Sequence, residues 1–208
     1  MDVVVAGGHG KIGLRLLRRL ADGGHRGRGL IRNPEHAADL EAAGAEPVVC
    51  DMEALDDLSG CCEGADAVVF AAGAGPGSGP ERKRTVDYGA AVKLMDAGIR
   101  RYVMVSAIAA GRPEEWSEAM RPYYEAKAEA DHRLEDSGLD YTIVRPGGLT
   151  DDPGTGLVTV GTDLERGEIP RDDVAAVLLA VLETPGSVGK TFELVAGDTA
   201  IDEAVRGL

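Results

Sequence analysis

The chain has 208 residues, of which 44% are hydrophobic and 28% charged, values typical of a folded globular protein of about one domain. Its 22 basic and 36 acidic residues give a formal net charge of −14, which argues against nucleic acid and anionic membranes as partners. No apolar run approaches the roughly 18 to 20 residues needed to span a bilayer, and the N-terminus lacks the pattern of a secretory signal.

Short apolar runs alternate with helical patterns, starting with a strand at 2–6 and a helix at 11–22 that a glycine pair ends. The first half then predicts strands near 28–32, 46–50 and 66–71, with helices near 34–43 and 54–58. A glycine- and proline-rich loop follows at 73–80. The second half predicts helices at about 81–97, 123–137 and 171–183, and strands at 100–106, 140–145 and 191–195.

This alternation predicts an α/β fold with a doubly wound parallel sheet. Helices should cover both of its faces, because strand–helix–strand crossovers are right-handed. We expect one domain over residues 1–208. The less regular segment at about 149–170 is expected to form a short lid over a substrate.

A glycine-rich turn, Gly-Gly-His-Gly-Lys-Ile-Gly at 7–13, directly follows the first strand. Residues without a Cβ allow a tight turn and a close approach of the backbone to a pyrophosphate, whose charge then meets the helix N-terminus. The turn therefore predicts a dinucleotide site that involves Gly7, His9, Gly10, Lys11, Ile12 and Gly13.

The end of the second strand bears on the choice of nucleotide. Many NAD sites place a carboxylate there for the ribose hydroxyl, whereas this chain has Arg32, which suits the 2′-phosphate of NADP. NADP is therefore favoured over NAD. Three further stretches are expected along the nucleotide: Asp51 and Met52 near the adenine, and the small residues Ala71, Ala72 and Gly73 beside the cofactor backbone.

Tyr123 and Lys127 form a Y-x-x-x-K pair whose spacing places both side chains on one helix face. An ammonium close to a phenol stabilises the phenolate and so lowers the phenol pKa from its usual value of about 10. The pair predicts that Tyr123 exchanges a proton near neutral pH while hydride moves to or from a carbonyl carbon.

The segments at 5–13, 102–106, 140–147, 169–175 and 189–194, together with the Tyr123/Lys127 pair, resemble an atypical short-chain dehydrogenase/reductase. The similarity is to its small NAD(P)H-binding, NmrA-like and biliverdin-reductase-B-like branch. The resemblance implies a Rossmann-type sheet of about seven strands in order 3-2-1-4-5-6-7. It also implies that Tyr123 is the acid/base, that Lys127 holds the nicotinamide ribose and that Pro146 passes beside the nicotinamide.

Ser106 and Ala107 depart from the pattern of these relatives, which often carry two serines after the fifth strand. The second of them normally orients the substrate carbonyl, and here that position is an alanine. Either Ser106 substitutes for it as a catalytic residue, or the carbonyl lacks this donor and the reductase chemistry is weak.

The leading interpretation is an NADP-dependent oxidoreductase for a small carbonyl, quinone or flavin-like molecule, expected to be a monomer or homodimer. The alternative is a non-catalytic NADP(H)-binding redox sensor of NmrA type. A sugar-nucleotide epimerase would need a larger substrate region. Three cysteines, an odd number, predict reduced thiols in the cytoplasm, and no cysteine or histidine spacing indicates a metal.

Overall fold

The computed structural model describes residues 1–75 and 77–208, so that Pro76, in the predicted glycine-rich loop, lies outside the described residues. Its main feature is a nine-stranded sheet in the order β11-β8-β10-β6-β5-β4-β1-β2-β3. The strands are β1 (Asp2–Ala6), β2 (Arg26–Ile31), β3 (Glu46–Val49), β4 (Ala67–Phe70), β5 (Arg101–Val105), β6 (Asp140–Pro146), β8 (Leu157–Gly161), β10 (Lys190–Ala196) and β11 (Thr199–Ala200).

The seven strands from β3 to β10 are parallel to their neighbours and confirm the predicted order, with β10 as the seventh strand. Two short strands extend this sheet beyond the prediction: β8 is antiparallel to β10, and β11 to β8. A second, two-stranded sheet pairs β7 (Gly148–Thr150) with β9 (Glu168–Pro170). The segment predicted as a lid therefore contains three strands.

Helices connect the parallel strands. They are α1 (Lys11–Asp22), α2 (Ala37–Ala42), α3 (Ser59–Cys62), α4 (Pro80–Arg82), the π-helix η2 (Lys83–Ala90), α5 (Ala91–Met95), α6 (Arg121–Glu135) and α7 (Arg171–Glu183), and a further helix, α8 (Ile201–Arg206), follows the last strand. Three short 3₁₀ helices complete the structure: η1 (Pro34–His36), η3 (Pro113–Glu115) and η4 (Pro185–Ser187). The first and the last predicted helices, 11–22 and 171–183, have the predicted bounds.

Two predicted helices are corrected. Residues 54–58 are not helical, and α3 begins only at Ser59. The Asp51 carboxylate accepts a hydrogen bond from the Glu53 amide and closes a turn just before this segment. The single helix expected over 81–97 is a succession of α4, η2 and α5, with a π-helical segment in its middle. Such segments often occur at functional sites.

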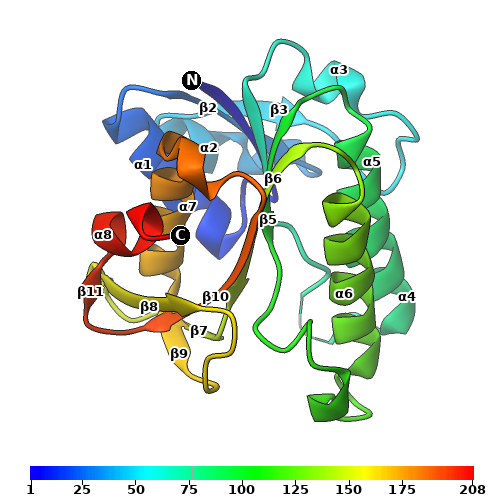
Figure 1. The fold of residues 1–208 in the computed structure, drawn as a ribbon. Coiled ribbons are helices and arrows are strands. Elements are labelled where there is room, and N and C mark those ends of the chain that lie inside the picture. Colours follow the sequence, from blue (N-terminus) through cyan, green and yellow to red (C-terminus); the bar gives the residue numbers. More distant parts are fainter. Residues whose placement is uncertain (76) are drawn as a thin grey trace.

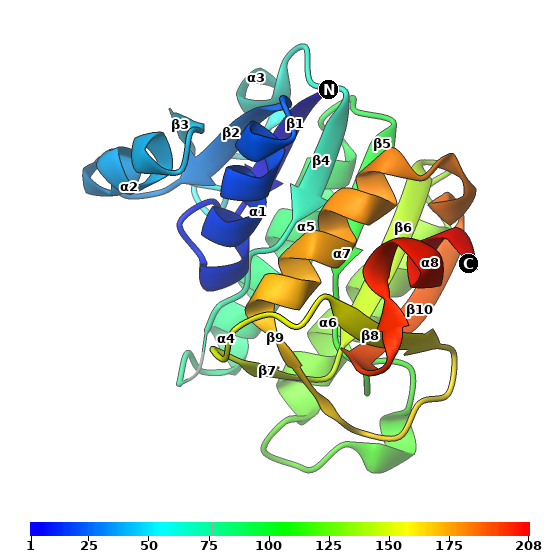
Figure 2. The same cartoon turned by 90° about the vertical axis from the view of Figure 1, so that its left-hand side faces the viewer.

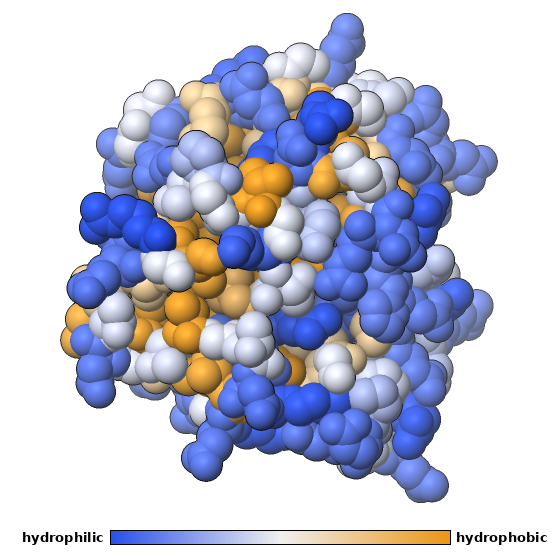
Figure 3. Space-filling model, in the orientation of Figure 1, coloured by the Kyte–Doolittle hydropathy of each residue, from blue (hydrophilic) through white to orange (hydrophobic). Residues whose placement is uncertain are grey.

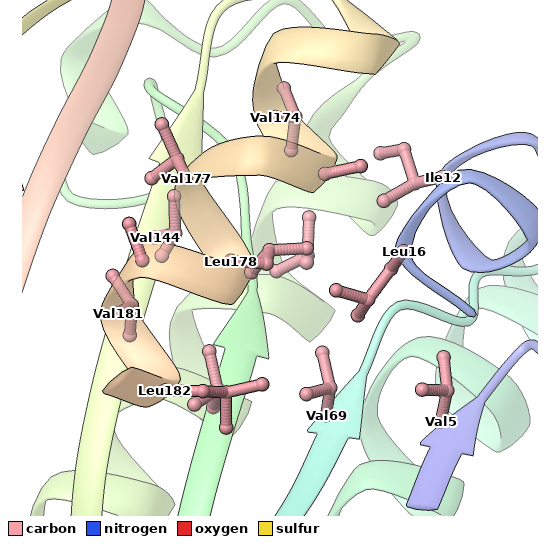
Figure 4. Close-up of a cluster of buried hydrophobic side chains, with 14 of the residues drawn as sticks. Val5, Ile12, Leu16, Val69, Val144, Val174, Val177, Leu178, Val181 and Leu182 are labelled. Carbon is pink, nitrogen blue, oxygen red and sulfur yellow. The ribbon is translucent and has the colours of Figure 1, made fainter. Parts of the chain in front are cut away.

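Helices cover both faces of the sheet, with α1 and α7 on one side and α5 and α6 on the other (Figure 1). Figure 2 shows α1 and α7 side by side in front of the strands. Because successive strand residues point to opposite faces, Val5 and Val69 pack with Leu16 of α1 and Leu178 of α7 (Figure 4). Full burial of each such side chain contributes about 1.5–3 kcal/mol.

The chain order of neighbouring strands reverses between β1 and β4, and in such sheets ligands bind outside the carboxyl ends of the strands at this point. The face shown in Figure 3 is largely hydrophilic, with hydrophobic side chains gathered toward its left half. Within the described residues, every helix is too short or too polar to cross a bilayer.

Candidate functional site

A cavity of about 1110 Å³ opens at the carboxyl ends of the central strands. It extends from Ile12, in the glycine-rich turn, past Ala71, Ala72 and Gly73 at the end of β4 to Tyr123 and Lys127 on α6. The cavity thus brings together residues that the sequence placed in a nucleotide site and in a catalytic site. Further lining residues are Lys83, Asp87, Ser106, Met120, Tyr124, Pro146, Leu149, Arg166 and Arg171.

The glycines of the turn are required by close backbone contacts. A Cβ on Gly7, whose φ is +80°, would lie 2.8 Å from the Ala72 Cα, and one on Gly13 would lie 2.3 Å from the Gly7 carbonyl oxygen. A Cβ on Gly8 would lie 2.7 Å from the Cα of Gly29 in β2. The turn is therefore held directly against the ends of β4 and β2, a position that no other residue type allows.

The turn leaves amide groups at the start of α1 available to a ligand. The Gly10 amide donates to the Gly7 carbonyl over 2.8 Å, and the Leu14 amide donates to the Gly10 carbonyl over 2.9 Å. Throughout the described chain, the amides of Lys11, Ile12 and Gly13 donate to no protein acceptor. The first turn of α1 contains no acidic residue. This arrangement fits an anionic group such as a pyrophosphate.

The side chains of His9 and Lys11 are held by carboxylates. His9 Nε2 lies 2.7 Å from Asp39 Oδ2, and its ring stacks on His36 with centroids 3.7 Å apart. Lys11 pairs with Asp151, which holds the pKa of that carboxyl below its usual range. Because Asp151 follows β7, the pair of Lys11 with Asp151 ties the predicted lid to the glycine-rich turn.

Arg32, which was predicted to select the nucleotide, directly follows β2, and its side chain is 61% exposed. Its Nη1 lies 3.2 Å from Oε2 of Glu53, a residue that the sequence analysis did not single out. The Asp51 carboxylate accepts the Glu53 amide over 3.0 Å and so stabilises the loop after β3. Met52 is half-buried and packs against the same core as Ala72.

Lys127 lies on the helix face that its spacing from Tyr123 predicts, and it is 3% exposed. Its ammonium donates to the Val105 carbonyl at the end of β5 over 3.0 Å. It also lies 3.5 Å from Oδ1 of Asp87, which is 1% exposed and comes from the π-helix. The other oxygen of Asp87 accepts the Ala74 amide over 3.1 Å. Asp87 is thus a buried part of the site that the sequence analysis missed.

The predicted effect of Lys127 on Tyr123 is wrong in direction. Burial raises the pKa of Tyr123, and the negative charge of Asp87 raises it further. The phenol is therefore protonated at neutral pH rather than poised near it. The physical reason is that burial disfavours the charged phenolate, and that Asp87, which lies against Lys127, adds a negative charge near it.

Ser106, the candidate donor to a substrate carbonyl, is hydrogen-bonded within the protein. Its Oγ lies at the cavity wall but donates to Oδ2 of Asp131 over 2.8 Å, and the Nε of Arg145 donates to the same oxygen over 2.9 Å. Asp131 is fully buried, and burial raises its pKa to about 6. While the hydroxyl proton of Ser106 is directed at Asp131, its oxygen can accept a hydrogen bond from the cavity.

Pro146, which the resemblance places beside a nicotinamide, also lies at the cavity. It ends β6, and the glycines that follow it line the cavity as well. Met120 and Tyr124 also line it, and Tyr124 stacks on Trp116 with ring centroids 6.0 Å apart. Tyr124, Met120 and Leu149 thus form part of the cavity wall.

Comparisons with known proteins agree with this geometry. A family model described as NAD(P)H-binding matches residues 7–185. The chain is 44% identical over 214 residues to the "Uncharacterized sugar epimerase YhfK" of Bacillus subtilis (strain 168), with 100% of each chain covered.

Two solved structures have the same fold over the whole chain. One, a "Putative NAD-dependent epimerase/dehydratase" from Bacillus halodurans, is 39% identical with a TM-score of 0.96 and 100% of each chain covered. The other, the "oxidoreductase ylbE" from Lactococcus lactis, is 29% identical with a TM-score of 0.88, covering 100% of this chain and 96% of that one.

Proposed function

The chain belongs to the NAD(P)H-binding family and is an atypical short-chain dehydrogenase/reductase in its fold and motifs. On this premise we propose that it is an NADP-dependent oxidoreductase, which transfers hydride to or from a small carbonyl, quinone or flavin-like substrate. The observation that carries the proposal is the single cavity that joins the glycine-rich turn to the Tyr123/Lys127 pair.

The nucleotide would be held by groups at both ends of its site. The free amides of Lys11, Ile12 and Gly13 would bind the pyrophosphate, and Arg32 would pair with the 2′-phosphate. Lys127 would contact the nicotinamide ribose from the cavity wall. The bound nicotinamide supplies or accepts the hydride.

Tyr123 would act as the proton donor to the substrate. Its raised pKa keeps the phenol proton in place at neutral pH, so that the proton is available to the substrate oxygen, which becomes a strongly basic alkoxide as hydride arrives. Ser106 would contribute an acceptor at the cavity wall, because its own proton is bonded to Asp131.

The substrate is proposed to be small because the lid is short. Residues 148–170 supply only the strands β7, β8 and β9 and their connections over the cavity. Part of the cavity would be taken by the nicotinamide end of the nucleotide. This argues against the epimerase activity that the names of two relatives suggest, since a sugar nucleotide needs a larger binding region.

One observation favours a second candidate, a redox sensor that binds NADP(H) without turnover. The hydrogen bond from Ser106 to Asp131 and the alanine at position 107 leave the substrate carbonyl without the usual serine donor. A sensor needs the nucleotide site but not this donor. The two candidates therefore differ in turnover and agree in nucleotide binding.

The test is Tyr123→Phe, assayed as NADPH oxidation with a panel of aldehydes, ketones, quinones and flavins. The oxidoreductase proposal predicts at least a hundredfold loss of turnover with nearly unchanged NADPH affinity. Tyr88→Phe is the matched control, because Tyr88 lies on the neighbouring π-helix outside the cavity lining. Wild-type turnover that survives in Tyr123→Phe excludes Tyr123 as the acid. Nucleotide binding without turnover of any acceptor by the wild type supports the sensor.

A further inference from the structure

Three donors from different segments converge on one carboxylate, that of Glu53. Arg32 Nη1, after β2, lies 3.2 Å from Glu53 Oε2, and Arg82 Nη2, in α4, lies 2.8 Å from the same oxygen. Thr85 Oγ1, in the π-helix, donates to Glu53 Oε1 over 2.8 Å. Both arginines, Arg82 foremost, help to hold the pKa of Glu53 below its usual range.

We propose that Arg32, Arg82 and Thr85 form the receptor for the 2′-phosphate of NADP, and that the Glu53 carboxylate fills it until the nucleotide displaces it. The inference rests on the proposed function, since it requires the nucleotide to bind at the glycine-rich turn. It adds two receptor residues and an internal competitor to the single arginine that the sequence indicated. The ligand class is a phosphate monoester on a ribose.

The donor set suits a phosphate better than a carboxylate. Two planar guanidinium groups and a hydroxyl offer donors from several directions, which matches three phosphate oxygens. A phosphate monoester also carries about −1.5 to −2 charges near neutral pH, against one for Glu53. The phosphate therefore gains more from the two arginines than the carboxylate does.

Glu53 can leave the receptor at small cost. The side chains of Arg32 and Arg82 are 61% and 46% exposed, and ion pairs between such exposed groups contribute little to stability. The Glu53 backbone is held independently of its side chain. Its amide donates to Asp51 over 3.0 Å, and its carbonyl accepts from Lys93 over 3.3 Å. The carboxylate can thus turn away while the loop after β3 stays in place.

A competing role for Glu53 makes the opposite prediction. A carboxylate near the end of the second strand can instead accept a hydrogen bond from the 2′-hydroxyl of NAD. Removal of its charge would then weaken NADH binding. If Glu53 is a competitor for the phosphate receptor, removal of its charge tightens NADPH binding and leaves NADH binding almost unchanged.

The experiment compares Glu53→Gln and Arg82→Ala with the wild-type chain by isothermal titration calorimetry. Four nucleotides serve as probes: NADPH and NADH, which differ in the 2′-phosphate, and 2′,5′-ADP and 5′-AMP, which differ in the same way without a nicotinamide. Arg84→Ala is the control for Arg82, because Arg84 lies two residues away and pairs with Glu129. Glu63→Gln is the exposed control for Glu53.

We expect Arg82→Ala to weaken NADPH and 2′,5′-ADP about tenfold, as the loss of a charge-assisted hydrogen bond does. NADH and 5′-AMP should change less than twofold. Glu53→Gln should tighten NADPH and 2′,5′-ADP by about threefold to tenfold at low salt, and added salt should reduce this gain. Both control variants should match the wild type.

Two results overturn the inference alone. One is an equal change for phosphorylated and unphosphorylated nucleotides in Arg82→Ala and Glu53→Gln, and the other is a loss of NADH affinity in Glu53→Gln. Failure of all four nucleotides to bind the wild-type chain would instead overturn the proposed function, and the inference with it. Thermal unfolding of each variant, unchanged from the wild type, excludes misfolding as the cause of a loss.

Discussion

The Lys127 ammonium lies 3.5 Å from Oδ1 of Asp87, and both side chains are almost wholly buried. That oxygen of Asp87 has no hydrogen-bond partner among the described residues. The cation that the Y-x-x-x-K spacing assigns to Tyr123 therefore also faces a carboxylate. Burial raises the pKa of Tyr123, and the negative charge of Asp87 raises it further, so that the phenol is protonated at neutral pH.

Replacing Asp87 by Asn should lower the pKa of Tyr123. The negative charge that raises it is removed, and Lys127 is then free to stabilise the phenolate. Ultraviolet absorbance of the phenolate, recorded as a function of pH, measures the shift. The signal of Tyr123 is isolated by subtracting the same titration of the Asp87→Asn/Tyr123→Phe double variant. An unchanged ionisation of Tyr123 in Asp87→Asn would show that Asp87 does not set its state.

The contribution of Asp131 to the free energy of unfolding should fall as the pH rises. Burial raises its folded pKa to about 6, above the unfolded value of about 3.9, so the folded state holds the proton more tightly. Its stabilising contribution is full below pH 4 and is lost as the pH rises through 6. Relative to Asp131→Asn, the wild type should lose about 2 kcal/mol of unfolding free energy between pH 4 and 7.

Urea unfolding at a series of pH values measures this difference. Asp140→Asn is the control of opposite sign, because the hydrogen bond from Arg100 holds the pKa of the exposed Asp140 below its usual range. The contribution of Asp140 should be lost as the pH falls. A wild-type minus Asp131→Asn difference that is flat or that rises with pH would contradict the buried, proton-binding state of Asp131.

Gly13→Ala should damage both the fold and the nucleotide site. The added Cβ would lie 2.3 Å from the Gly7 carbonyl oxygen and 3.0 Å from that of Gly8, so the turn must open. Such overpacking costs about 1–3 kcal/mol, and the displaced amides should bind NADPH much more weakly. Gly60→Ala in α3 is the control, since its Cβ would meet nothing within 4 Å. NADPH affinity retained in a stable Gly13→Ala variant would contradict the role of the turn.

Much of the fold could be predicted because local signals agree with its topology. The apolar run at 2–6 and the leucine spacing at 11–22 gave the bounds of β1 and α1, and the strand–helix alternation gave the parallel order. The short strands β8 and β11 could not be predicted, because β8 depends on pairing with β10 and β11 on pairing with β8. The π-helix was missed because its pattern reads as an ordinary helix.

The site was predicted where motifs are local and missed where distant segments meet. Tyr123 and Lys127 share one helix, so their spacing alone places them together. Asp131 carried a usable signal, since it lies four residues after Lys127 on the same buried face of α6. Asp87 and Glu53 gave no such signal, because only the folded sheet brings them to Lys127 and Arg32.

The central claim is that the turn between β1 and α1 binds the pyrophosphate of a nicotinamide nucleotide. Calorimetric titration of the full chain with NADPH tests it most directly. The structure and the family lead us to expect saturable heat with one nucleotide per chain, at higher affinity than for NADH. An absence of binding heat with NADPH, NADP, NADH and NAD alike would contradict the claim.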